Sequence, residues 1–521
     1  MTELAISETV FTERWAKIRE RRTGALCAWH GRLSDLMAVL EQDEPRQTIR
    51  TFAQAGLDDV LAAVKALGHI KDAGLIIHGG EGCAAGASAL IKQFDQKDSA
   101  TKLYSTALSE NDSILGGEEP LAEAVSRARA QGAKRVIFIL RTPMTAINND
   151  DVASVIHQHY EHGSKLVYVP VDGLRSKTAL SGLDSLSHAC LSDLIEGPGE
   201  SERIANGRLE SERLVNARID KLLLVSMSES AEDIAEIIES LKSLGINVCS
   251  APRFSSSETF IDSGRYRAAL ALNAEEGEYL VQGLAHNFGV KALSSLAPVG
   301  LRATDAFLQA ALLVMTGEAD GEAPTGLDST FDSNLDSTAA SPLDLTLGSA
   351  KALERVPGRS EAMQAVIAAP GRGIRAFLSG SLPVVASLAE AVKDLGGSVV
   401  GAAFPIAEAQ SLTDLSRLAE ASSDSLTVCV GNEPFEIANI LFKNPADVLI
   451  GGAGFGRLAR DLGALHLSTA RRSFYGYRGL SALAEALDFA KKLPKSVSTS
   501  RLYQASWLNK PGNWHIKLET L

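Results

Sequence analysis

The sequence contains little cysteine, few aromatic residues and no long apolar run. Its five cysteines are widely spaced among 521 residues, a pattern that excludes a disulfide-stabilised secreted domain. No stretch approaches about 18 uninterrupted apolar residues, so the sequence predicts no transmembrane helix. Residues 1–22 mix charged and apolar side chains and lack the apolar core of a secretory signal. We therefore expect a protein of the cytoplasm that spans no membrane.

An excess of basic charge and an ATP-binding loop are also missing. The formal net charge is −13, which argues against a nucleic-acid-binding protein because such proteins gather lysine and arginine. No phosphate-binding loop of the form GxxxxGKS or GxxxxGKT occurs, so any ATP hydrolysis coupled to this chain takes place on another protein. At 521 residues the chain is too long for one hydrophobic core, and several domains are expected.

Short apolar runs alternate with helical patterns along most of the chain. Runs of this length are typical of buried parallel strands, and the helices between them cover the faces of the sheet. The sequence therefore predicts an α/β fold of three Rossmann-like domains with parallel sheets flanked by helices. These domains would cover residues 1–219, 220–316 and 349–521, the last with a C-terminal helix. The clearest strand runs are 134–140, 165–171, 221–227, 246–252, 267–273, 374–381, 398–404, 425–431 and 446–452.

Residues 317–348 interrupt this alternation with a stretch rich in Asp, Ser, Gly and Thr. Such a composition predicts a mobile acidic linker or surface loop that the protein can lose without harm. The alternative is a cation-binding loop built on Asp328, Asp332 and Asp336, although their spacing does not match an EF-hand.

A glycine-rich turn ends the first apolar run. Residues 76–83 read IIHGGEGC, so two buried-type residues are followed by His78, three glycines and Cys83. Glycine removes side-chain bulk and permits unusual backbone angles, so such a loop can close over an inorganic cluster that a thiolate binds. Taken alone, these eight residues are explained better by an ordinary glycine-rich turn with one buried cysteine. His78 is either a proton carrier near a cluster or a packed imidazole that donates to a backbone carbonyl.

Two later stretches extend this pattern. Residues 105–121 read STALSENDSILGGEEPL, and residues 141–152 read RTPMTAINNDDV. Together with HGGEGC, in this order, they resemble the nitrogenase component 1 superfamily. Its members carry H-G-x-x-G-C, then S-T-x-L-x-E-x-D-x-x-x-G-G-E, then S-T-C followed by I-x-D-D. The match is close in the first two blocks and partial in the third, and weaker similarity extends along most of the chain.

The resemblance implies that Cys27 and Cys83 are ligands of an iron–sulfur cluster, either P-cluster-like or 4Fe–4S. The third family cysteine falls at Pro143, which has no donor atom, so a partner subunit must supply further ligands. The family spaces its first two cysteines by roughly 25 residues. In this chain 56 positions separate Cys27 from Cys83 (83 − 27). We interpret part of residues 28–70 as an insertion.

The resemblance further implies a β-type subunit of an α2β2 complex that does not hold the catalytic cofactor. No cysteine follows RAALALN at 267–273, and no histidine lies within 471–480, where α-type chains carry their cofactor ligands. Electrons would come from a homodimeric iron–sulfur ATPase, the only component that binds ATP, and pass through the shared cluster to the α-type chain.

Two functions fit this architecture. The first is a nitrogenase-like reductase, and Pro143 together with the chain length leads us to favour a methylthio-alkane reductase. The second is the β-type half of a scaffold on which a nitrogenase cofactor is assembled. A free-standing sugar- or nucleotide-binding α/β protein is a third and more distant alternative.

Overall fold

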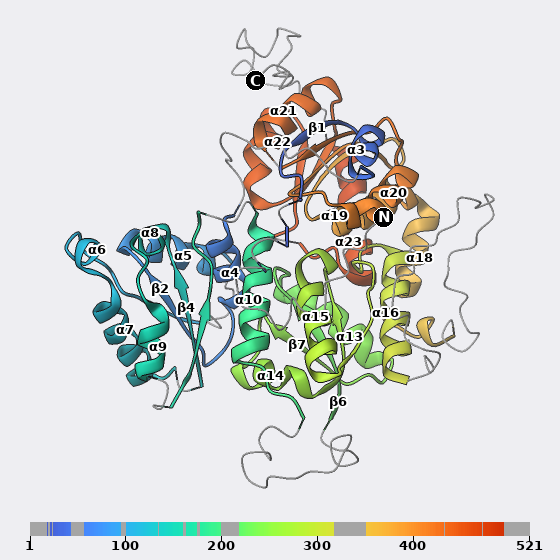
Figure 1. The fold of residues 1–521 in the computed structure, drawn as a ribbon. Coiled ribbons are helices and arrows are strands. Elements are labelled where there is room, and N and C mark those ends of the chain that lie inside the picture. The colour runs from blue at the N-terminus through green and yellow to red at the C-terminus, as the bar shows by residue number, and fades with distance from the viewer. Residues whose placement is uncertain are drawn as a thin grey trace, which may run out of the picture.

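The strands of this computed structural model form three separate sheets, each with helices packed against it (Figure 1). The structure describes residues 18, 21–22, 24–42, 57–94, 101–133, 135–159, 163–174, 178–198, 218–316, 351–431, 433–470 and 472–493. The acidic stretch 317–348 lies outside these residues, as does most of the N-terminal segment up to residue 23.

The first sheet has the strand order β3-β2-β4-β5, and all its strands are parallel. The central strand is buried along its whole length because its residues are apolar up to His78. The strands are β2 (Gly74–His78), β3 (Lys102–Ser105), β4 (Val136–Arg141) and β5 (Lys165–Val169). The helices are α4 (Asp59–Leu67), α5 (Glu81–Phe94), α6 (Asp112–Leu115), α7 (Glu118–Ala130), α8 (Pro143–Asn148) and α9 (Val152–His159).

The second sheet repeats this arrangement with the parallel order β7-β6-β8-β9. Helix α10 lies between the first two sheets and packs against both α4 and α15 (Figure 1). The strands are β6 (Ile219–Ser226), β7 (Val248–Pro252), β8 (Tyr266–Ala271) and β9 (Lys291–Ala292). The helical elements are α10 (Ala179–Asp193), α13 (Ala231–Ser243), α14 (Ser257–Ile261), η1 (Asp262–Arg265), α15 (Ala274–Phe288) and α16 (Leu301–Thr316).

The third sheet has six strands in the order β1-β12-β11-β10-β13-β14, parallel except for the edge strand β1. Its strands are β1 (Trp29–Arg32), β10 (Arg375–Ser379), β11 (Ser398–Phe404), β12 (Thr427–Val430), β13 (Val448–Gly451) and β14 (Leu465–Ser468). The helical elements are α3 (Leu33–Leu40), α18 (Arg359–Ala368), α19 (Leu382–Asp394), η2 (Ala409–Ser411), α20 (Leu412–Ala421), α21 (Pro434–Lys443), η3 (Ala453–Phe455), α22 (Gly456–Asp461) and α23 (Gly476–Lys492).

The N-terminal segment contributes to the third sheet. Strand β1 pairs antiparallel with β12, with Trp29 opposite Val430, and α3 follows it. In Figure 1 this blue segment lies among the orange elements of the third sheet. Residues 29–40, which the sequence groups with the first domain, therefore pack on the last one, and α4 begins the elements around the first sheet.

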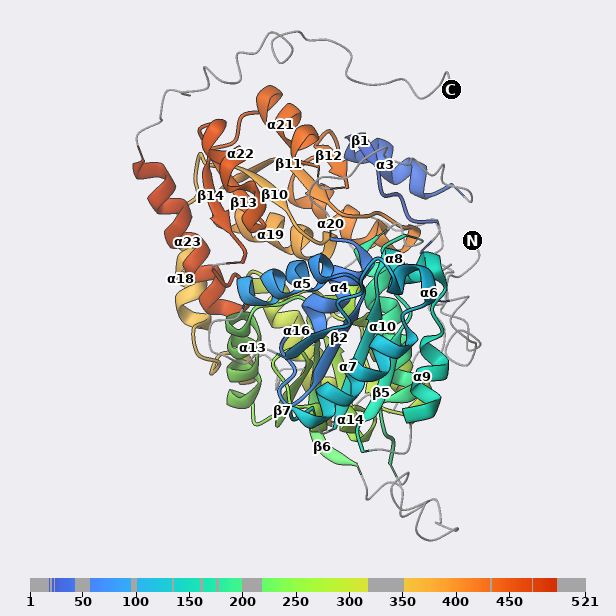
Figure 2. The same ribbon diagram turned by 90° about the vertical axis from the view of Figure 1, so that its left-hand side faces the viewer.

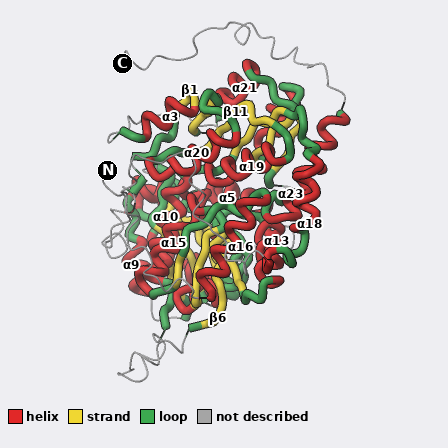
Figure 3. The backbone as a smooth tube through the Cα atoms, turned by 90° about the vertical axis from the view of Figure 1, so that its right-hand side faces the viewer, coloured by secondary structure: helices red, strands yellow, loops and turns green. Residues whose placement is uncertain are grey.

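All three sheets share one topological feature. A central strand is followed along the chain by its neighbour on one side and later by its neighbour on the other, as in β2, β3 and β4. Loops diverge where the order reverses, so the carboxyl ends of the two central strands are where α/β proteins usually bind ligands. Figure 2 shows α5, α6 and α8 at this end of the first sheet, and Figure 3 shows helices surrounding the strands.

No helix among the described residues is long and apolar enough to cross a membrane.

Candidate functional site

The three sequence blocks around residues 76–83, 105–121 and 141–152 meet at the carboxyl ends of β2, β3 and β4. The carbonyl of His78 accepts hydrogen bonds from the backbone nitrogen and the hydroxyl of Thr142, at 3.2 and 3.0 Å, and from the hydroxyl of Thr145 at 3.1 Å. The backbone nitrogen of Gly79 donates to the hydroxyl of Thr106 at 2.9 Å. Each block thus contributes polar atoms to the reversal point of the first sheet.

The imidazole of His78 is fully buried between side chains of the other two blocks. Its Nδ1 lies 3.3 Å from the hydroxyl of Thr106, and its Nε2 lies 3.0 Å from Oδ2 of Asp150. The sequence predicted either a proton carrier or a ring that donates to a backbone carbonyl. The ring contacts a hydroxyl and a carboxylate and not a backbone carbonyl, because the loops after β3 and β4 close over it, while a role as proton carrier stays a prediction.

Burial shifts the pKa values of both groups in this pair. The pKa of His78 falls to about 4, mainly because burial disfavours the imidazolium, which the nearby Glu118 only partly offsets. The pKa of Asp150 is raised, first by burial and then by repulsion from Glu118. At neutral pH the imidazole is therefore uncharged. Nε2 of His78 and Oδ2 of Asp150 lie 3.0 Å apart in this buried space, without the alignment of a hydrogen bond.

Two glycines permit the close approach of the three blocks. A Cβ added at Gly79 would overlap the side chain of Thr142. A Cβ at Gly117 would lie 2.5 Å from Oδ2 of Asp150 and 2.7 Å from Cε1 of His78. The glycines of both blocks thus provide the space in which the loops pack, as glycine does where backbones approach closely.

Cys83 lies in the first turn of α5, three residues after Gly80. Its backbone nitrogen donates to the carbonyl of Gly80 at 3.1 Å, and its side chain is exposed. Ala84, the next residue, is buried in the apolar cluster of the first two domains. The strand, turn and helix therefore present this thiol to the solvent, where a group outside this chain can reach it.

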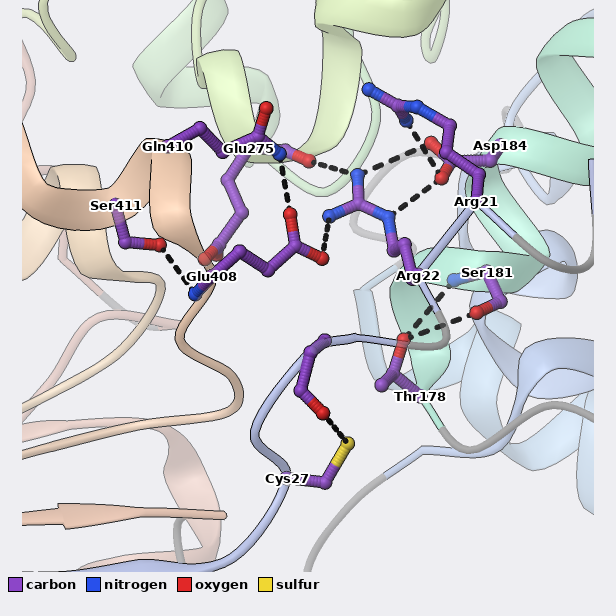
Figure 4. A network of polar contacts seen from close by, with 11 residues as sticks. Arg21, Arg22, Cys27, Thr178, Ser181, Asp184, Glu275, Glu408, Gln410 and Ser411 are labelled. Atoms are coloured by element: carbon purple, nitrogen blue, oxygen red, sulfur yellow. Dashed lines mark hydrogen bonds and ion pairs between the residues drawn. The ribbon is translucent and has the colours of Figure 1, made fainter. Parts of the chain in front are cut away.

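Cys27 occupies a different kind of environment, a half-buried segment held at both ends (Figure 4). On one side the guanidinium of Arg22 binds Asp184 of α10 at 2.6 and 3.2 Å and Glu408 at 3.2 Å. On the other side Leu26 and Ala407 exchange two backbone hydrogen bonds. The thiol of Cys27 lies 3.6 Å from the carbonyl of Ala25.

The described part of the chain does not supply a complete ligand set by itself. Among the described residues, no group of three His, Cys, Asp or Glu side chains is arranged to hold a metal ion. Cys27 packs against the same apolar cluster that contains Ala84, the residue that follows Cys83 in the sequence. Pro143 is the first residue of α8, where a ring without an N–H suits a helix start and no thiolate is offered. Two thiols remain as candidate ligands.

The carboxyl edge of the first sheet also carries an exposed apolar surface that the sequence analysis missed. Ile114 and Leu115 of α6 are 81% and 85% exposed, and Ile147 of α8 is 73% exposed. The two short helices are joined by a hydrogen bond of 2.8 Å from the side chain of Asn148 to the carbonyl of Ser113. We call Ile114, Leu115 and Ile147 the α6–α8 surface. Its sequence signal is the apolar pair before Gly116–Gly117.

Comparison with known families identifies the chain. The family model described as nitrogenase component 1 type oxidoreductase matches residues 59–490. The chain belongs to this family. The matched range begins at α4 and ends within α23, so it covers all three sheets except β1.

Curated relatives of this component 1 chain are named as cofactor-assembly proteins. The nitrogenase iron–molybdenum cofactor biosynthesis protein NifN of Rhodobacter capsulatus is 36% identical over 93 residues, 18% of this chain and 19% of the relative. NifN of Herbaspirillum seropedicae is 28% identical over 182 residues, 35% of this chain and 38% of the relative. NifE of Methanococcus maripaludis is 30% identical over 138 residues, 26% of this chain and 28% of the relative. The matches therefore span well under half of each relative.

A solved structure confirms the fold. The structure titled "Nitrogenase Cp1 at pH 6.5" superposes with a TM-score of 0.67 and covers 88% of this chain and 97% of its own. The sequences are 16% identical, so this likeness concerns the fold. The predicted α/β architecture and the predicted family are both confirmed.

Proposed function

We propose that this chain is the β-type subunit of a nitrogenase-like α2β2 reductase. It helps to hold an iron–sulfur cluster between subunits through Cys27 and Cys83, and the cluster relays electrons to a cofactor in the α-type chain. The observation that carries this proposal is the exposed thiol of Cys83 at the reversal point of the first sheet, beside the meeting of three family blocks. Iron–sulfur clusters take thiolate ligands, and an incomplete set that includes the exposed Cys83 suits a cluster that two chains share.

The α6–α8 surface supports a second element of the proposal, the docking of the electron donor. It lies at the same edge of the sheet as Cys83, and three large apolar side chains gather there on two linked helices. Exposed apolar groups of this kind mark protein contact sites. We assign this surface to the homodimeric iron–sulfur ATPase, which delivers electrons to the edge where the cluster is held.

Within the assembly, Cys83 and Cys27 would hold the cluster, and the cluster would supply one-electron chemistry. The residues of this chain provide the surroundings. His78 and Asp150 are in contact behind the Cys83 loop and shielded from solvent. The bonds from Thr142 and Thr145 fix the loop backbone at His78. The Arg22–Asp184 ion pair fixes the segment that carries Cys27.

The deciding experiment uses the complex. The chain is co-expressed with its α-type partner and purified without oxygen, and its mass by light scattering and its iron per αβ pair are measured. We expect an α2β2 heterotetramer with bound iron that reduces a methylthio-alkane when the ATPase component and ATP are added. A monodisperse, iron-loaded monomer would contradict the assembly, and an iron-free heterotetramer would contradict the shared cluster.

A second candidate function is a cofactor-assembly scaffold, and the names of the NifN and NifE relatives favour it. A scaffold holds a precursor cluster and passes it on instead of turning over substrate. The same purified complex distinguishes the two functions. A reductase converts thioether with multiple turnovers, whereas a scaffold shows no turnover and activates a cofactor-free nitrogenase component when the two are mixed.

A further inference from the structure

The α6–α8 surface and the Cys83 loop are joined by one buried pair of side chains. Asp150 lies between α8 and α9, and it accepts a hydrogen bond from the backbone of Gly117, which lies between α6 and α7. The backbone nitrogen of Asp151 donates to the side chain of Glu118 at 2.8 Å. The segments that follow α6 and α8 are therefore tied together at Asp150, and Asp150 in turn contacts the ring of His78.

His78 continues this connection into the loop that carries Cys83. The ring belongs to the last residue of β2, and the same residue accepts three hydrogen bonds from the start of α8 at its carbonyl. Both side chains of the pair are shielded from solvent, with 0% of His78 and 2% of Asp150 exposed. The ring and the carboxylate are in contact at 3.0 Å within this closely packed space, so a displacement of α6 or α8 acts directly on the strand end before Gly79.

We propose that His78 and Asp150 are positioning residues that couple the α6–α8 surface to the Cys83 loop. A protein bound at Ile114, Leu115 and Ile147 shifts α6 and α8, and the pair carries this shift to the thiol of Cys83. The coupling to a docked protein rests on the proposed function. The positioning of the loop does not, because it follows from contacts within this chain.

The positioning role is tested by hydrogen–deuterium exchange of the backbone amides from Gly79 to Cys83 in the complex with the α-type partner. Asp150→Ala removes the carboxylate that contacts the His78 ring and accepts a hydrogen bond from the backbone of Gly117. We expect these amides to exchange about tenfold faster, the effect of one lost buried hydrogen bond. Asp150→Asn keeps one acceptor oxygen and should give an intermediate rate. Unchanged exchange in Asp150→Ala would overturn the proposal.

Thr101→Val is the matched control, because Thr101 is a buried residue at the opposite end of the same sheet. Its hydroxyl donates to the carbonyl of Leu67 at 2.6 Å and accepts from the backbone of Ile70 at 2.9 Å. This variant also loses buried hydrogen bonds, but exchange at residues 79–83 should stay within about twofold of wild type. Equal effects of Thr101→Val and Asp150→Ala would show a general loss of stability and overturn the positioning role. If Asp150→Ala does not fold, His78→Ala and Asp150→Asn take its place in the same comparison.

The coupling to the docked protein is tested by steady-state electron transfer with the ATPase component. For Asp150→Ala we expect kcat to fall about tenfold while KM for the ATPase component is unchanged, because the docking surface is intact. For Leu115→Arg we expect a raised KM for the ATPase component and an unchanged kcat. An Asp150→Ala complex with wild-type kcat would overturn the coupling. A wild-type complex that accepts no electrons would contradict the proposed function, while the exchange experiment would still decide the positioning role.

Discussion

The side-chain amide of Asn273 donates a hydrogen bond of 3.0 Å to the hydroxyl of Ser381. Asn273 follows β8 in the second sheet, and Ser381 follows β10 in the third, so the carboxyl edges of these two sheets face each other. A second polar contact joins the first domain to the same region, because Nη1 of Arg253 after β7 donates to the carbonyl of Lys65 in α4 at 2.5 Å. The second and third domains therefore meet through the loops that follow β8 and β10, whereas the first domain meets the loop after β7 through α4.

The ion pair between Arg22 and Asp184 gives the first prediction. Asp184→Ala would leave the buried guanidinium without its main partner and should lower the free energy of unfolding by about 3–5 kcal/mol, measured by urea denaturation. Asp488→Ala breaks an exposed i,i+4 pair with Lys492 and should cost less than about 0.5 kcal/mol. Similar losses in the two variants would contradict the structural importance assigned to Arg22.

Gly79 and Gly80 form a matched pair of adjacent sites, and neither has a positive φ. Gly79→Ala would force a Cβ into Thr142 and should destabilise the protein by about 1–3 kcal/mol. At Gly80 a Cβ meets nothing within 4 Å, so Gly80→Ala should leave the stability within about 1 kcal/mol of wild type. Thermal unfolding of both variants measures this difference, and equal melting temperatures would refute the close packing of the first and third sequence blocks.

His78 gives a prediction for acid. Its pKa is about 4 in the folded protein and near 6.5 when unfolded, so the unfolded chain binds more protons between these values. The stability from the neutral ring is complete above pH 6.5 and is lost as the pH falls through 4, by about 3 kcal/mol. Urea denaturation at pH 7 and pH 4.5 measures the loss of unfolding free energy between these values. The loss should be smaller in His78→Gln than in wild type, because glutamine does not titrate.

The acid-dependent loss of stability is compared between wild type and His78→Gln because other buried groups also titrate in this pH range. Burial also raises the pKa of Glu229 to about 7 and that of Glu275 to about 8. A raised carboxyl pKa acts in the opposite sense, since it favours the folded state at lower pH. Both glutamates are present in wild type and variant, so their contribution cancels. Identical pH profiles in the two proteins would contradict a neutral, buried His78.

Cys83→Ala should remove the iron of the shared cluster and leave the fold intact, because the side chain is exposed and makes no core contact. The measurements are iron per αβ pair and the reduced-state EPR spectrum of the purified complex. Cys190→Ala is the control. Cys190 is fully buried in α10, so its replacement should lower stability by about 1 kcal/mol and keep the iron. Full iron content in Cys83→Ala would mean that this thiol is no ligand.

Leu115→Arg should prevent docking of the ATPase component without destabilising the chain, because the side chain is 85% exposed. We expect at least a tenfold weaker association, measured by titration of the ATPase component at constant salt. Leu493→Arg, at an exposed apolar position beyond α23, is the control and should bind normally. Weak association of both variants would indicate a general effect of the added charge.

Sequence patterns predicted the parallel strands well, because these strands are continuous apolar runs. The predicted run 134–140 and the observed β4 overlap almost completely, as do 398–404 and β11. Amphipathic segments were less clear. α20 lies in a stretch to which no helix was assigned, since its buried residues Leu415, Leu418 and Ala421 are few and its other side chains are polar. The pairing of β1 with β12 could not be foreseen, because no local pattern encodes a partner so far along the chain.

The candidate site was predictable as a set of sequence blocks, but its geometry was not. HGGEGC and NNDD both stood out in the sequence, yet nothing local places His78 within 3.0 Å of Asp150. That contact depends on the order of β2 and β4 in the sheet, which brings their two exit loops together. The roles of Cys27 and Cys83 as ligands stay predictions, since the cluster itself would be completed by another chain.

Strand β1 imposes an order on the maturation of the protein. The segment around Cys27 is synthesised about 400 residues before β12, and its neighbour β1 can pair only when β12 has left the ribosome. If Cys27 binds a cluster, this thiol therefore reaches its final place only once β12 is available for pairing.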